Sequence, residues 1–147
     1  MQRERCANDN HVRVFISFDL AHDGDLKDRL VDESLRPGSP FAIAARSEAA
    51  DGERMRSGIA ASDEVIVICG MHTEGSAQVS AEVRIAQEEH KPYFLLWGRR
   101  EVICTRPAGA KPGHAMYSWT WNILHDQVLA TLRNSQPREV PAHYKKP

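Results

Sequence analysis

The chain has 147 residues, which suits one domain and is long enough to bury a core without disulfides or metals. Apolar residues make up 41% and charged residues 27%, and the formal net charge of -1 gives no sign of a nucleic-acid-binding surface. The three cysteines form no CxxC pair, which argues against a disulfide framework and a structural zinc site.

The N-terminus, MQRERCANDN, is polar and contains no apolar core of a signal peptide. No apolar run approaches the roughly 20 residues that a membrane span needs. We therefore expect a cytoplasmic protein that binds neither a membrane nor nucleic acid.

The first strand is predicted at Val12–Ser17, where apolar residues on both faces indicate that helices cover both sides. A helix should follow, because Asp23 and Asp25 provide acidic residues at its start and RPGSP provides a stop. Its apolar stripe is formed by Leu26, Leu30 and Leu35.

Phe41–Ala45 is a weaker second strand, and Asp51 is placed to cap a second helix with Met55 and Ile59 facing inward. Val65–Cys69 is the clearest strand. Its continuous apolar run is typical of a central parallel strand with helices on both faces.

The next helix is predicted from about Ala77 to Glu89, followed by a buried strand at Tyr93–Trp97. The segment Gly98–Tyr117 holds either a short edge strand near Val102–Cys104 or only a long loop. A last helix should start near Trp119.

The predicted buried stripe of the helix from Ala77 to Glu89 is Val79, Val83 and Ala86. That of the last helix is Trp121, Leu124, Val128 and Leu132.

Strands that alternate with helices in this way predict an α/β fold, with a parallel sheet of four to five strands flanked by helices. We expect one domain over residues 12–133. Residues 1–11 should form a flexible N-terminus and residues 134–147 a disordered tail.

Ligands of open parallel sheets bind outside the carboxyl ends of the strands, so residues that follow the strands are candidates for a site. They are Ser17, Phe18, Asp19, Arg46, Ser47, Glu48, Gly70, His72, Thr73, Trp97, Gly98 and Arg99. Carboxylates, hydroxyls, guanidinium groups and an aromatic ring are suited to a nucleotide. The simpler interpretation is that Ser17 and Asp19 cap the following helix and that Arg46, His72 and Arg99 are ordinary surface residues.

Several chemistries lack their motifs. There is no GxxxxGK[ST] phosphate loop, no GxGxxG after the first strand, and no GxSxG nucleophile elbow. The histidines form no HExxH, so we expect no catalytic metal. The third strand does not end in the aspartate of a phosphoacceptor receiver. The loop after the first strand, SFDLAHDG, is not the hydroxyl-rich phosphate loop of a flavodoxin.

Four segments between Val12 and Leu132 resemble the TIR-like proteins of bacterial anti-phage (Thoeris-type) systems. They are VFISFD, ASDEVIVICGMHTEGS, SAEVRIAQEEHKPYFLLWG and YSWTWNIL. The resemblance implies a flavodoxin-like TIR fold. It also implies cleavage of NAD+ at the nicotinamide-ribose bond, giving ADP-ribose or a cyclic ADP-ribose isomer that activates a partner effector.

The resemblance places the family's catalytic glutamate at Glu82 and its loop after the first strand at Ser17, Phe18 and Asp19. With the residues at the strand ends, the predicted substrate-binding set is Ser17, Phe18, Asp19, Arg46, His72 and Thr73. NAD+ is then a substrate, and no separate cofactor or metal is expected. One position departs from the family, since many TIR enzymes carry a tryptophan four residues before the glutamate, where this chain has Gln78.

Three functions remain open. The first is an NAD+-consuming signalling enzyme that works as a homo-oligomer through TIR-TIR contacts and reaches a downstream effector through a diffusible product. The second is a non-catalytic TIR-like module that self-associates or binds a nucleotide signal, with Glu82 an ordinary solvated helical glutamate. The third is an enzyme that acts on another nucleotide or nucleoside.

Overall fold

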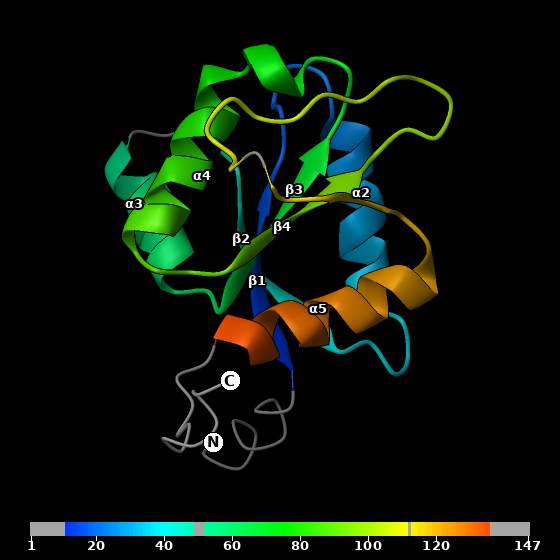
Figure 1. Ribbon diagram of the computed structural model, residues 1–147. Coiled ribbons are helices and arrows are strands. Elements are labelled where there is room, and N and C mark those ends of the chain that lie inside the picture. Colours follow the sequence, from blue (N-terminus) through cyan, green and yellow to red (C-terminus); the bar gives the residue numbers. More distant parts are fainter. Residues whose placement is uncertain (1–10, 49–51, 112, 136–147) are drawn as a thin grey trace, which may run out of the picture.

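The computed structural model describes residues 11–48, 52–111 and 113–135, and the side chains of the last helix up to residue 131. Within them, a parallel sheet of five strands has the order β2-β1-β3-β4-β5 (Figure 1). The strands are β1 (Val12–Ser17), β2 (Phe41–Arg46), β3 (Glu64–Cys69), β4 (Tyr93–Trp97) and β5 (Met116–Ser118). The α-helices are α2 (Gly24–Ser34), α3 (Gly52–Ala60), α4 (Ala77–Glu88) and α5 (Trp121–Ser135), and a short 3-10 helix, η1, spans Thr73–Gly75. The prediction of an α/β, flavodoxin-like fold is confirmed.

The helices cover both faces of the sheet, which gives the protein two apolar clusters. Helices α2 and α5 pack on one face, where Leu30 and Leu124 meet Ile66 of the central strand (Figure 1). Helices α3 and α4 pack on the other, where Ile59 and Val83 meet the opposite side of β3. Every residue of β3 is buried, Glu64 included, and the burial of Val65–Cys69 is what the continuous apolar run predicts for a central parallel strand.

The pairing of β1 with β2 contains an irregularity that affects the site. Val14 lies opposite Ile43, but Phe15 lies opposite Ala45, so Ala44 has no partner on β1. One extra residue in a strand reverses the faces of all side chains that follow it. Ile43 therefore packs towards α2 and α5, whereas Ala45 packs towards α3 and α4.

Strands β1 and β4 match their predicted bounds, and β2 and β3 are each one residue longer, at Arg46 and Glu64. The predicted stripe of α2 was wrong at one position. Leu35 is 76% exposed, because the helix ends at Ser34 and the helical period no longer applies beyond it. Gly38, with a φ of 83°, completes the turn that follows.

The alternative of a short edge strand near Val102–Cys104 was also wrong. The edge strand is Met116–Ser118, which pairs with Leu95–Trp97, and residues 98–115 form a long connection that contains no strand within its described part. The capping role of Asp51 lies outside the described residues, as do positions 1–10 and 136–147 of the predicted flexible ends. Helix α5 continues to Ser135, two residues into the segment predicted as a tail. No helix of the described chain is long and apolar enough to cross a membrane.

Candidate functional site

Glu82 lies on the inward face of α4. The helix begins after Ser76, whose Oγ accepts a hydrogen bond from the Val79 N–H at 3.1 Å. Val79, Glu82 and Ala86 are separated by three and four residues, so they share the face that packs on the sheet. Glu82 is only 1% exposed, which is unusual for a carboxylate and requires polar partners in the interior.

Three neutral donors meet at one oxygen of this carboxyl group. Glu82 Oε1 accepts hydrogen bonds from Ser17 Oγ at 2.6 Å, Ser47 Oγ at 2.7 Å and Gln78 Nε2 at 3.0 Å. Ser17 reaches Glu82 because it shares the α4 side of β1 with Phe15. Ser47 reaches it because the extra residue Ala44 turns Ser47 towards the same side.

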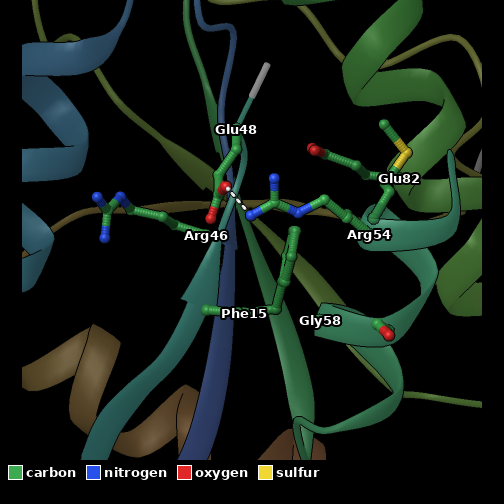
Figure 2. Close-up of a pocket in the computed structure, with 9 residues that line it drawn as sticks. Phe15, Arg46, Glu48, Arg54, Gly58 and Glu82 are labelled. Atoms are coloured by element: carbon green, nitrogen blue, oxygen red, sulfur yellow. Dashed lines mark ion pairs between the residues drawn. The ribbon is translucent and has the colours of Figure 1, made fainter. Parts of the chain in front are cut away.

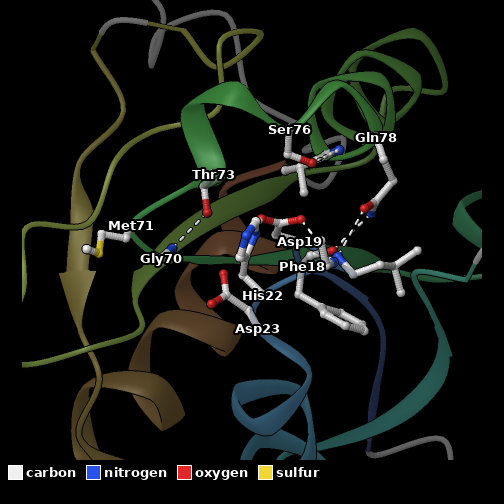
Figure 3. Close-up of polar contacts among 12 residues, drawn as sticks. Phe18, Asp19, His22, Asp23, Gly70, Met71, Thr73, Ser76 and Gln78 are labelled. Carbon is white, nitrogen blue, oxygen red and sulfur yellow. Dashed lines mark hydrogen bonds and ion pairs between the residues drawn. The ribbon is translucent and has the colours of Figure 1, made fainter.

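Gln78 joins Glu82 to the loop that follows β1, and Figure 3 shows its contacts with that loop. Its Nε2 also donates to the Phe18 carbonyl at 2.9 Å, and its Oε1 accepts from the Leu20 N–H at 3.2 Å. The Phe18 N–H donates to Ser47 Oγ at 3.1 Å. The loop after β1, the end of β2 and α4 are thus held together by hydrogen bonds around Glu82.

Burial raises the pKa of Glu82 above its usual value, because loss of solvent disfavours the charged carboxylate. Hydrogen bonds from Ser17, Ser47 and Gln78 act in the opposite direction and offset part of that rise. No described side chain forms an ion pair with Glu82. The group is therefore a buried acid with hydrogen-bond donors but without a positive partner in the described chain.

Glu82 also lines a pocket of about 300 Å³ between β2, α3 and α4 (Figure 2). This volume is near the lower end for small-molecule sites. The lining residues are Phe15, Ala45, Arg46, Glu48, Arg54, Met55, Ser57, Gly58 and Glu82. Phe15 provides an apolar wall. An ion pair between Arg54 and Glu48, at 3.5 Å, lies at the pocket, with both side chains at least half exposed.

The structure brings only part of the predicted substrate-binding set to this pocket. Ser17 touches Glu82 directly, and Arg46 lines the pocket. Figure 2 shows the Arg46 side chain extending away from Glu82, as expected after the register shift in β2. The ring of Phe18 packs in the core on the α2 side, so this residue contributes its backbone rather than its ring.

The other three predicted residues, Asp19, His72 and Thr73, do not line this pocket. Figure 3 shows Asp19 and Thr73 among the polar contacts of the loops after β1 and β3. Asp19 Oδ2 is 2.7 Å from Nδ1 of His22, whose ring stacks on His72 at 3.9 Å between centroids. Thr73 is fully buried, and its Oγ1 accepts a hydrogen bond from the Gly70 N–H at 2.7 Å. Thr73 therefore fixes the loop after β3.

A separate ion-pair network lies beside this loop. Arg99 is 3.0 Å from Asp23 and 2.8 Å from Asp25. Burial raises the pKa of Asp23, although the hydrogen bond and charge of Arg99 act to lower it. Asp23 Oδ2 is buried and has no hydrogen-bond partner among the described residues. The network ties the carboxyl end of β4 to the start of α2.

Two residues of the Glu82 network were not among the predicted site residues. Ser47 was a candidate only by its place after a strand, and Gln78 was interpreted as a departure from a family pattern. The spacing of Glu82 with Val79 and Ala86 is the sequence signal that indicates its burial.

Among the residues that the structure describes, no group of three or more His, Cys, Asp or Glu side chains is arranged to hold a metal ion.

No protein-family model matches the chain, and no curated protein matches it.

Proposed function

We propose that this chain is a TIR-like enzyme that cleaves the nicotinamide-ribose bond of NAD+ at the Glu82 pocket. The observation that carries the proposal is the combination of burial, hydrogen bonding and position at Glu82. Its carboxyl group is buried, held by three neutral donors on one oxygen, and placed at the wall of a pocket without a cationic partner among the described residues. A transient positive charge on a bound ligand is the partner that this arrangement lacks.

The proposed reaction needs such a carboxylate. The bond between ribose C1′ and the nicotinamide nitrogen breaks, and its electron pair leaves with nicotinamide, which departs as a neutral molecule. The ribose carries the positive charge as an oxocarbenium-like centre, as in glycoside hydrolysis. The carboxylate of Glu82 stabilises this charge. Water then adds at C1′ and loses a proton to give ADP-ribose, or an adenine nitrogen adds at C1′ and the adenine loses a proton to give a cyclic product.

The hydrogen bonds at Oε1 suit this role. They fix the carboxyl group before substrate binds, and they favour its charged form against the effect of burial. Figure 2 shows the Glu82 carboxyl group extending from α4 into the space that the pocket residues surround. As part of the same proposal, copies of the chain contact one another, and a diffusible product reaches an effector.

The burial of Glu82 favours a second candidate, a non-catalytic nucleotide-binding or self-associating module. With 1% exposure and hydrogen bonds from Ser17 of β1, from Ser47 after β2 and from Gln78 of its own helix, Glu82 has a structural role in either case. The two candidates are separated by incubating concentrated protein with NAD+ and resolving the products by chromatography. The enzyme releases nicotinamide. The module releases none, but its melting temperature or oligomeric state changes with a nucleotide.

A further inference from the structure

A second pocket lies at the carboxyl ends of β4 and β5, on the side of α2. Its volume is about 630 Å³, roughly twice that of the Glu82 pocket, and the two share no lining residue. It is lined by Arg29, Trp97, Gly98, Arg100, Ser118, Trp119 and Thr120. This edge is where open parallel sheets bind their ligands.

The lining contains two arginines and no acidic residue. The Arg29 guanidinium carbon lies over the Trp119 ring, 3.9 Å from its centroid, and Arg29 Nε is 3.5 Å from Glu33 Oε2. Glu33 is itself held by Trp119, whose Nε1 donates to Glu33 Oε1 at 2.8 Å. Stacking and the ion pair therefore fix the orientation of Arg29 before any ligand binds.

Arg100 differs from its neighbour in the chain. Arg99 is paired with Asp23 and Asp25, whereas Arg100 makes no ion pair or hydrogen bond with any described residue. Arg100 is exposed at the pocket, so its guanidinium is available to a ligand from solvent. Guanidinium groups bind phosphate specifically, because two of their N–H groups can donate to two oxygens of one phosphate at the same time.

The backbone at Gly98 brings the end of β4 close to its neighbours. A Cβ at this position would lie 2.7 Å from the Cys69 carbonyl oxygen and 2.7 Å from Leu26 Cδ1, so no larger residue fits without displacement. The pocket wall is therefore built of backbone on this side. The Ser118 hydroxyl on β5 adds a neutral hydrogen-bonding group to the lining.

We propose that this pocket is a binding site for a phosphorylated small molecule, a phosphate monoester of the size of a nucleotide or a sugar phosphate. The two guanidinium groups bind the phosphate, and a volume of about 630 Å³ exceeds what inorganic phosphate fills. The proposal goes beyond NAD+ cleavage and does not depend on it, because neither arginine lies at the Glu82 pocket.

Titration calorimetry and thermal unfolding with four probes test the site: AMP, ribose 5-phosphate, inorganic phosphate and adenosine. We expect AMP and ribose 5-phosphate to bind and to raise the melting temperature, and adenosine and inorganic phosphate to bind more weakly than either. Comparison of AMP with ribose 5-phosphate then distinguishes the nucleotide from the sugar phosphate as the source of the phosphate.

Arg100→Ala should weaken AMP binding about tenfold or more, since a hydrogen bond to a charged group is lost. Arg84→Ala, which removes an exposed arginine of α4, should leave it unchanged. Glu82→Gln should also retain AMP binding, which separates this site from the proposed catalytic pocket. Absence of binding of both AMP and ribose 5-phosphate at millimolar concentration, or equal binding of these probes by wild type and Arg100→Ala, would overturn the proposal.

Discussion

Ser17 and Glu82 are 65 residues apart in the sequence, yet Ser17 Oγ lies 2.6 Å from Glu82 Oε1 in the interior of the protein. The contact joins the carboxyl end of β1 to the inward face of α4. It forms because strand alternation directs Ser17 to the side on which helical spacing directs Glu82. Together with the further donors Ser47 and Gln78, this contact places a hydrogen-bonded carboxyl group in the wall of the pocket.

Ser47→Ala is expected to raise the pKa of Glu82. The Ser47 hydroxyl donates to the Glu82 carboxyl group, and this hydrogen bond lowers a pKa that burial already raises. The variant should also lose about 1 kcal/mol of unfolding free energy. NMR titration of the Glu82 carboxyl carbon measures the pKa. Ser80→Ala on the same helix is the control, and an unchanged pKa in Ser47→Ala would refute the role given to this hydroxyl.

Gln78→Glu should make stability strongly dependent on pH. A second carboxyl group about 3.0 Å from Glu82 raises the pKa of the pair in the folded state above that in the unfolded state. Stability is then fully present below the unfolded pKa and is lost as pH rises through the folded values. Urea unfolding at pH 5 and pH 8 measures the loss. Gln78→Met loses the same hydrogen bonds without the charge, so its loss should be similar at both pH values.

Glu64 is fully buried at the start of β3, and neither of its oxygens has a hydrogen-bond partner among the described residues. Burial raises its pKa from 4.5 to about 9. Because the folded pKa is the higher one, the stability that protonated Glu64 contributes is fully present below pH 4.5 and is lost as the pH rises towards the folded pKa.

Glu64→Gln removes this titration. The variant should therefore be more stable than wild type at pH 8, and the difference between them should shrink towards pH 5. Free energies of unfolding of the two proteins, measured between pH 5 and pH 8, test this prediction. Parallel curves for the two proteins would show that Glu64 does not titrate as its burial implies.

The order of elements was predictable because the buried strands are short continuous apolar runs, whereas the helices carry apolar stripes at helical spacing. The edge strand was not, since Met116–Ser118 has only three residues and is selected by pairing with β4 rather than by a pattern. The start of β3 was missed for a related reason, because a glutamate argues against a buried strand position and Glu64 is an exception.

The site was predictable in part. The family resemblance pointed to Glu82, and its spacing with Val79 and Ala86 agrees with a buried position. The donors around it depend on tertiary structure. Ala44 shifts the register of β2, which turns Ser47 towards Glu82 and leaves Arg46 exposed, and no local pattern in the sequence indicates this shift.

The most direct test of the account is nicotinamide release from NAD+ by concentrated wild-type protein, Glu82→Gln and Glu74→Gln. Glu74 is an exposed glutamate of η1 and serves as the matched control. We predict release by wild type and Glu74→Gln, and a loss of about a hundredfold or more in Glu82→Gln with its fold retained by circular dichroism. Equal release by folded wild type and Glu82→Gln, or none from concentrated wild type, would contradict the assignment.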